Sequence, residues 1–411
     1  MGRTDLLDEN IYDIERADEL AWKAKRSGVS RREYLRMMIV GGAALGASSF
    51  GNRVAVAQKD EAILKNAPDE FFIRSGSNLE MRWEAMYNRG YIVPVEGFYV
   101  RNNSPVVPRI DKASWRLQIE GSGVNRTSTF NYDEILNMPS VSVIRAIECA
   151  GNGRNFFEIS HGKKIPGTPW NLGGIGVAEW TGVPLREILE RAGIKRTARD
   201  VMPEGLDQLH VRRPMPIQKA LAADTLLVYA MNGQPLLPDH GFPIRLLLPG
   251  WVGIGNIKWV GRIEVSVNPL YSEWNTKKYV MIGSDYKPNP PALGPVLTAQ
   301  KVKSAFELPW NGVITSGKRL LRGRSWSGEG KITKVEVSLD GGNKWQLARL
   351  REPNIDLAWV RWDVDWDPRP GGYKLQARAT DSKGNTQPNH IPFNEEGYFH
   401  WAVVTHPITV R

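Results

Sequence analysis

The chain has 411 residues, of which 41% are hydrophobic and 24% are charged. This apolar content excludes an intrinsically disordered chain, and the length predicts two folded units, because domains usually hold about 100–200 residues. The formal net charge of +10 predicts an anionic substrate, cofactor or partner, although a solvated basic surface would give the same charge. The sequence contains no basic run, zinc-finger spacing or aromatic RNA-binding motif that would indicate a nucleic acid.

Residues 1–57 have the features of an export signal. Arg31 and Arg32 precede an apolar run that is rich in Gly and Ala and ends at Phe50. The run is too short to cross a bilayer, which needs about 20 residues. Ala55-Val56-Ala57 then supplies the small residues of a cleavage site. The paired arginines predict the twin-arginine route and a periplasmic protein, and a short N-terminal core helix is the alternative.

Strands and helices are mixed between about residues 95 and 285. The runs 141–147, 244–248 and 257–267 are apolar and predict strands. Residues 181–193 (TGVPLREILERAG) predict a helix, in which Pro184 suits the first turn and Gly193 marks the end. The helix has one apolar face, made by Leu185, Ile188 and Leu189.

A proline-rich segment at 284–295 predicts a linker, and the pattern changes after it. Apolar residues alternate at 335–339, a turn follows at Asp340-Gly341-Gly342, and alternation resumes at 345–347. This pattern is typical of a β-hairpin. Residues 373–379 alternate again before a turn at 381–385, so we expect an antiparallel β-sandwich. The expected units are 1–57 (export signal), 58–293 (first domain) and 294–411 (β-sandwich).

The single cysteine, Cys149, excludes an intrachain disulfide, a Cys-rich zinc site and a covalent c-type haem. It follows a predicted strand and opens the sequence CAGNGR, which contains Gly151, Gly153 and Arg154. Glycines let backbone N–H groups converge on an anion, and a nearby positive charge favours the thiolate. Cys149 is therefore predicted to be a metal ligand or nucleophile, and a buried, inert cysteine remains the alternative.

A second cluster lies in DHGFPIRLLLPGWVGIGNIKW, where His240, Arg245 and Lys258 flank one strand and its turn. Such side chains near Gly253 and Gly255 predict a phosphate site, and three basic surface residues are the alternative. The sequence lacks the motifs of P-loop NTPases, zincins and the usual serine hydrolases, so these classes are excluded.

Four motifs, taken in order, resemble those of the sulfite oxidase family of molybdopterin enzymes. They are R-N-x-x-P from Arg101, C-A-G-N-x-R from Cys149, D-H-G-F-P-x-R from Asp239 and S-L-D-G-G-x-x-W from Ser338. The resemblance covers about residues 95–411. It implies an α+β molybdopterin-binding domain followed by an immunoglobulin-like β-sandwich that forms a homodimer. Within the family, the chain is most similar to the molybdenum subunits of sulfane dehydrogenases, from the Sox system of thiosulfate oxidation.

The resemblance also implies a cofactor, molybdenum-molybdopterin, and residues that hold it. The thiolate of Cys149 would bind molybdenum directly, which suits a soft sulfur ligand. The pterin phosphate would be bound by His240, Arg245 and Lys258, and Arg101 would add a further cofactor contact.

A substrate pocket is implied by the same resemblance. Arg101 and Arg154 would line it as oxyanion-binding groups, and Trp170 would form part of its wall. Tyr279 would lie near the metal and assist the movement of protons and electrons.

Three departures from the family pattern concern this pocket. Asn103 stands where sulfite oxidases usually have His, and Lys278 stands where an acidic residue often precedes the tyrosine. The C-terminal arginine expected a few residues after Gly397 is missing, and His400 and His406 occur in that region instead. One fewer charge-assisted hydrogen bond, worth roughly 1.5–3 kcal/mol, weakens the binding of free sulfite.

These departures favour a larger substrate, a sulfane sulfur on a carrier protein, with electrons passing to a c-type cytochrome subunit. Three alternatives stay open. One is a sulfite dehydrogenase that acts on free sulfite, and another is a family reductase that acts on oxidised methionine. The third is a non-catalytic module that recognises an anionic partner.

Overall fold

The computed structural model describes residues 62–87 and 89–411. The predicted export signal lies outside these residues. Within them, no helix combines the length and the apolar character that a membrane crossing requires.

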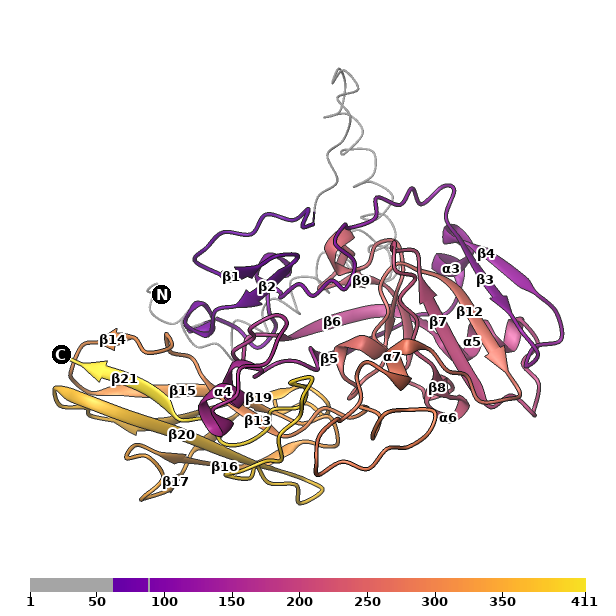
Figure 1. Cartoon of the computed structure of the whole chain (residues 1–411). Coiled ribbons are helices and arrows are strands. Elements are labelled where there is room, and N and C mark those ends of the chain that lie inside the picture. The colour runs from indigo at the N-terminus through magenta and orange to yellow at the C-terminus, as the bar shows by residue number, and fades with distance from the viewer. Residues whose placement is uncertain (1–61, 88) are drawn as a thin grey trace, which may run out of the picture.

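The first domain is built on two five-stranded sheets (Figure 1), whose hydrogen-bonded neighbours are antiparallel except for the parallel pair β3 and β12. One sheet has the order β10-β9-β6-β5, with β11 paired to β9, and the other has the order β4-β3-β12-β7-β8. A small hairpin, β1-β2, precedes them. The strands are β1 Phe72–Ser75, β2 Asn78–Met81, β3 Arg116–Glu120, β4 Ser128–Asn131, β5 Val141–Glu148, β6 Ile175–Pro184, β7 Asp200–Gly205, β8 Met215–Pro216, β9 Leu226–Met231, β10 Gln234–Pro235, β11 Arg245–Leu247 and β12 Val260–Ser266.

The helices of this domain are short. The α-helices are α3 Tyr132–Asn137, α4 Asn155–His161, α5 Leu185–Arg191, α6 Ile217–Ala220 and α7 Glu273–Thr276. The 3-10 turns are η2 Trp83–Met86, η3 Val95–Gly97, η4 Pro238–His240 and η5 Gly253–Gly255.

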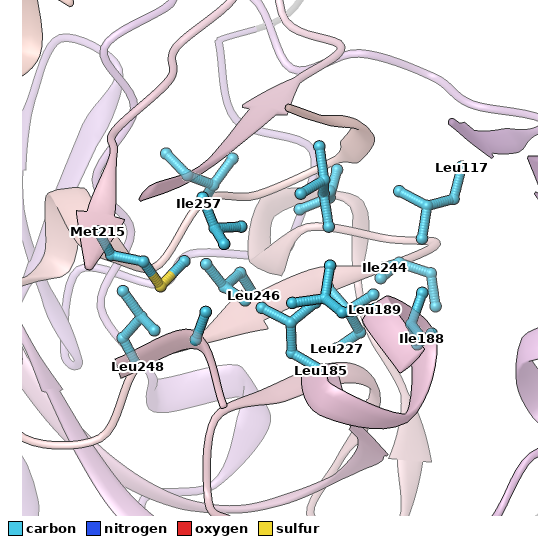
Figure 2. Close-up of a cluster of buried hydrophobic side chains, with 14 of the residues drawn as sticks. Leu117, Leu185, Ile188, Leu189, Met215, Leu227, Ile244, Leu246, Leu248 and Ile257 are labelled. Carbon is cyan, nitrogen blue, oxygen red and sulfur yellow. The ribbon is translucent and has the colours of Figure 1, made fainter. Parts of the chain in front are cut away.

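Helix α5 confirms the predicted apolar face. Its Leu185, Ile188 and Leu189 are fully buried and belong to the same core cluster as Leu227 of β9 and Leu246 of β11 (Figure 2). The helix is shorter than predicted, because residues 181–184 extend β6 and pair with β9. Pro184 is extended and caps the helix instead of lying in its first turn.

The predicted strands at 141–147, 244–248 and 257–267 appear as β5, β11 and β12. The proline-rich segment 284–295 forms neither helix nor strand and leads into the second domain. The strands there are β13 Lys303–Phe306, β14 Val313–Ile314, β15 Arg319–Trp326, β16 Ile332–Ser338, β17 Gln346–Leu347, β18 Arg349–Arg351, β19 Trp359–Trp366, β20 Gly371–Asp381 and β21 His406–Val410.

These strands form two sheets, ordered β13-β15-β19-β18 and β14-β21-β20-β16-β17, around one core. The predicted hairpin is confirmed, since β16 and β17 pair antiparallel with Glu336 opposite Leu347. The second alternating run lies within β20. The architecture is therefore the predicted α+β domain followed by a β-sandwich.

The two domains share a core. Trp326 of β15 and Trp359 of β19 belong to the same buried cluster as Val177 and Trp180 of β6. Trp83 of η2 stacks on Trp326 with ring centroids 5.9 Å apart. After β20 the chain returns to the first domain, where Phe399 N–H donates to the carbonyl of Ala150 (2.9 Å).

Candidate functional site

Cys149 begins a tight loop at the end of β5. Its N–H donates to the carbonyl of Gly174 (2.8 Å), and its carbonyl accepts the N–H of Asn152 (3.0 Å). Gly153 has a φ of +95°, and a Cβ atom there would lie 3.0 Å from the Cβ of His400. Only glycine fits this position without strain, which explains one of the glycines of CAGNGR.

The sandwich domain holds this loop from behind. Lys303 Nζ on β13 donates to Glu148 Oε1 (2.8 Å) and to the carbonyl of Asn152 (2.7 Å). Asn152 Nδ2 donates to the same carboxylate oxygen (2.9 Å). Lys303 and Glu148 are each only 2% exposed, so a fully buried ion pair joins the second domain to the residue that precedes Cys149.

A cavity that opens to solvent lies in front of the loop, and Cys149 and Ala150 of the loop line it. Its lining brings together six of the predicted site residues, namely Arg101, Cys149, His240, Arg245, Lys258 and Tyr279. These residues come from positions far apart in the sequence, so the fold creates the site.

Buried basic residues line one end of the cavity. Arg245 and His240 are buried, and Lys258 Nζ donates to the carbonyl of Asp239 (2.9 Å) and to the side chain of Asn102. Burial lowers the pKa of Arg245 to about 10 and lowers the pKa values of His240 and Lys258 well below their usual ranges. Three basic side chains gathered in one buried place favour a bound anion such as a phosphate.

The other end of the cavity joins Arg101 to Tyr279 through Asn103. The side-chain oxygen of Asn103 accepts from Arg101 Nη2 (2.7 Å) and from the Tyr279 hydroxyl (3.1 Å). Burial works to lower the pKa of Arg101, but the neighbouring Tyr279 and Cys149 groups outweigh it and raise that pKa. Arg101 is thus a fixed positive charge beside the cysteine.

The remaining two predicted site residues lie outside the cavity lining. Arg154 donates to the carbonyls of Thr168 (2.9 Å) and Glu396 (3.2 Å), and its guanidinium lies over the ring of Tyr398. Trp170 is buried one layer back, with its ring edge-on to Tyr99, which does line the cavity. Their side chains therefore support the cavity from behind.

The C-terminal segment 394–402 of the sandwich packs against Tyr279 and against helix α4. The ring of Tyr398 stacks on Tyr279 with centroids 4.9 Å apart. His400 is buried between Phe156 and Phe157, and burial lowers its pKa to about 3. Sequence patterns did not indicate these contacts, because the segment lies far from both CAGNGR and Tyr279 in the chain.

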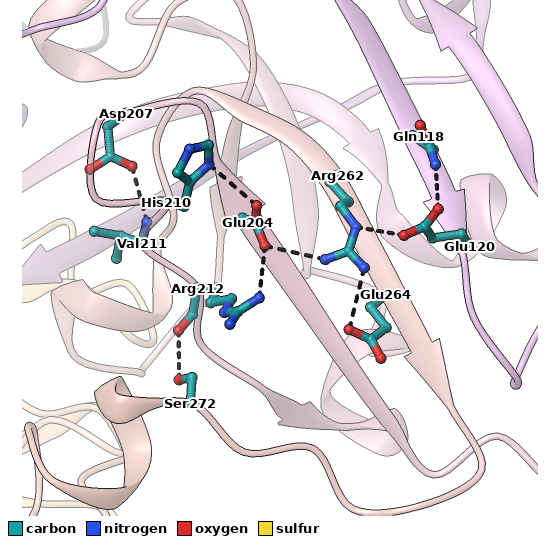
Figure 3. A network of polar contacts seen from close by, with 10 residues as sticks. All are labelled: Gln118, Glu120, Glu204, Asp207, His210, Val211, Arg212, Arg262, Glu264 and Ser272. Atoms are coloured by element: carbon teal, nitrogen blue, oxygen red, sulfur yellow. Dashed lines mark hydrogen bonds and ion pairs between the residues drawn. The ribbon is translucent and has the colours of Figure 1, made fainter.

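Sequence reasoning also missed residues 206–213, which bring Asp207 and Val211 to the cavity. Asp207 Oδ1 accepts the N–H of Val211 (3.1 Å). Beside this loop, Arg262 of β12 pairs with Glu120 of β3 and Glu204 of β7 (Figure 3). Glu204 also pairs with His210 (3.4 Å) and Arg212 (3.3 Å), and these two contacts tie the loop to the sheet.

Comparisons with known proteins agree with this geometry. Residues 104–274 match the family model described as oxidoreductase molybdopterin binding domain, and residues 297–407 match the Mo-co oxidoreductase dimerisation domain. Mitochondrial sulfite oxidase from Macaca fascicularis is 34% identical over 332 residues, which cover 74% of this chain and 59% of that protein. Sulfite oxidase from Gallus gallus is 35% identical over 321 residues, covering 73% and 69%.

A solved structure shares the fold over most of both chains. The sulfane dehydrogenase SoxCD from Paracoccus pantotrophus superposes with a TM-score of 0.71 at 28% identity, over 87% of this chain and 93% of that chain. The fold and the site thus define a molybdopterin-binding oxidoreductase. The chain belongs to the sulfite oxidase family, and it spans 59% of the length of the mammalian sulfite oxidases that it matches.

The cavity fits the cofactor of this family. Two buried polar atoms in its lining, Arg245 Nε and Asp207 Oδ2, have no hydrogen-bond partner in the part of the chain that the structure describes. An unpaired donor suits the phosphate, and an unpaired acceptor suits the N–H groups of a pterin. The described residues contain no group of three or more His, Cys, Asp or Glu that could hold a metal ion.

Proposed function

We propose that this protein is the catalytic subunit of a periplasmic sulfane dehydrogenase. It oxidises sulfane sulfur that derives from thiosulfate and is bound to a carrier protein, and it passes the electrons to a c-type cytochrome subunit. The observation that carries the proposal is the cavity that combines Cys149 with Arg101 and Tyr279. Similarity to SoxCD along most of both chains supports the sulfane substrate.

The predicted site residues that line the cavity each have a role in this reaction. When bound, the molybdenum cofactor supplies two-electron oxygen-atom transfer. Cys149 would ligate the metal, and His240, Arg245 and Lys258 would hold the phosphate. Arg101 would stabilise the negative charge that develops on the substrate oxygens, which is a large catalytic effect for a preplaced cation.

Tyr279 is placed to hold or donate a proton at its hydroxyl oxygen. Asn103 fixes that hydroxyl relative to Arg101, because one amide oxygen accepts from both groups. The stacked ring of Tyr398 restricts the rotation of Tyr279. The same few side chains therefore position the proton of Tyr279 and the negative charge that develops on the substrate.

A sulfite dehydrogenase is the second candidate, and the identity of 34–35% to animal sulfite oxidases favours it. The two candidates are separated by comparing turnover of free sulfite with turnover of a thiosulfate-charged carrier protein, each with a c-type cytochrome as acceptor. The proposal expects turnover of the carrier-bound substrate to dominate. High turnover of sulfite alone would overturn it.

The role of Cys149 has a separate test. Cys149→Ser replaces a soft thiolate by a hydroxyl of similar size, so we expect molybdenum ligation and activity to be lost while the chain still folds. Full cofactor loading with undiminished activity in this variant would refute the ligand role. Elemental analysis for molybdenum in the purified wild-type protein also separates an enzyme from a non-catalytic anion-binding module.

The proposal extends to location and assembly. Replacing Arg31 and Arg32 by Lys should retain the protein in the cytoplasm, as measured by cell fractionation, because the twin-arginine route reads the pair. The match of residues 297–407 to a dimerisation domain supports a homodimer. Light scattering at micromolar concentration should give twice the mass of one chain.

A further inference from the structure

Residues 62–65 lie against the phosphate end of the cofactor cavity. The N–H of Leu64 donates to Asp239 Oδ1 and that of Lys65 to Asp239 Oδ2, at 3.1 and 2.8 Å. The carbonyl of Ala62 accepts from Asn102 Nδ2 (3.2 Å). The two bonds to Asp239 connect positions more than 170 residues apart in the sequence. Tertiary structure therefore fixes the segment in place.

The two residues that anchor this segment also hold Lys258. Lys258 Nζ donates to the backbone carbonyl of Asp239 and to the side-chain oxygen of Asn102. The segment and the phosphate-binding lysine therefore share both anchors. Displacement of the segment would remove hydrogen-bond partners from the side chains of Asn102 and Asp239 and so loosen the support of Lys258.

Lys65 adds a positive group at the same place. Its Nζ donates to the carbonyls of Phe98 (2.6 Å) and Val95 (3.1 Å) and lies 3.5 Å from His240 Nε2. Burial lowers the pKa of Lys65 to about 7. A phosphate bound nearby would favour the protonated form again, so binding of the anion and charging of the lysine support each other.

We propose that residues 62–65 form a latch over the phosphate end of the cavity and that Lys65 is a cofactor-retaining residue beside His240. The latch acts on cofactor binding and is therefore independent of whether the substrate is sulfane sulfur or sulfite. If the export signal ends at Ala57, the latch remains part of the mature chain.

The latch predicts how long the cofactor stays bound. In Lys65→Met the ammonium is lost but the chain length is kept, and we expect molybdenum and pterin to be released roughly ten-fold faster or more during dialysis, the factor expected for one charged hydrogen bond. Lys65→Arg should retain the cofactor nearly as well as the wild type. Lys318→Met, at an exposed lysine of the sandwich, is the matched control and should change nothing.

Molybdenum is measured by elemental mass spectrometry and pterin by fluorescence after oxidation. Equal release from folded Lys65→Met and the wild type would overturn the proposal. Hydrogen exchange on the wild type gives a second test that needs no variant. Binding is reciprocal, so the amides of Leu64 and Lys65 should exchange at least ten-fold more slowly in the cofactor-loaded protein than in the cofactor-free protein. Equal exchange in both forms would also overturn it.

Discussion

Asn103 alone links Arg101 to Tyr279 at the end of the cavity where we place the substrate. Its amide oxygen is the shared acceptor for Arg101 and Tyr279. Asn103→Ala removes that acceptor, so we expect kcat to fall about ten-fold while molybdenum content is unchanged, because a hydrogen bond to a charged group contributes about 1.5–3 kcal/mol. Steady-state kinetics with parallel metal analysis checks this. Asn103→His, which restores the residue usual in sulfite oxidases, should lose less, and an unchanged kcat in Asn103→Ala would contradict the shared-acceptor role.

The burial of His406 leads to a prediction of how the free energy of unfolding depends on pH. It is buried on β21 and its Nε2 lies 3.1 Å from the carbonyl of Pro309, while burial lowers its pKa to about 4. The unfolded chain takes up a proton near pH 6.5, but the folded chain resists it until about pH 4. Stability contributed by the neutral form is therefore complete above pH 6.5 and is lost as the pH falls toward 4, on the order of 2–3 kcal/mol.

His406→Gln should reduce the slope of unfolding free energy against pH between 6.5 and 4.5, as measured by urea titrations. His390→Gln, at an exposed position, is the control and should leave the slope unchanged. A slope in His406→Gln equal to that of the wild type would show that other groups dominate acid unfolding.

Elements that are local in sequence could be predicted, and elements that depend on distant partners could not. The β16-β17 hairpin and helix α5 followed from periodicity and turn residues. Local patterns place the end of β6 in the helix. They miss the strand because its end is set by pairing with β9, which is distant in sequence. Likewise, CAGNGR indicated Cys149, but nothing near it in sequence pointed to the latch or to segment 394–402.

The buried pair of Lys303 and Glu148 makes β13 part of the site. Lys303→Met leaves the carboxylate buried without its cation, which typically costs about 3–5 kcal/mol. Because Glu148 precedes Cys149, we expect molybdenum content to fall together with the free energy of unfolding. The double variant Lys303→Met/Glu148→Gln should recover part of both, since no charge is left unpaired. Urea unfolding and elemental analysis measure the two effects. A loss of stability with full cofactor loading would show that the ion pair stabilises the fold but does not shape the site.

At the scale of the whole molecule, the site depends on both domains at once. The Cys149 loop and Tyr279 come from the first domain, and the sandwich supplies Lys303 behind the loop and Tyr398 against Tyr279. The tryptophan-rich core shared by β6, β15 and β19 keeps these parts in register. The second domain therefore has a role in shaping the site in addition to any role in dimer formation.

The shared core predicts that the two domains unfold together, although multidomain chains often unfold in separate steps. Calorimetry should show one transition with equal calorimetric and van't Hoff enthalpies. Trp359→Ala removes a fully buried side chain from the shared core and should cost about 3–5 kcal/mol, lowering that single transition and the cofactor content together. Leu347→Ala, at an exposed leucine of β17, is the control and should leave both unchanged. Two resolved transitions in the wild type, of which Trp359→Ala shifts only the one belonging to the sandwich, would show that the domains are energetically independent.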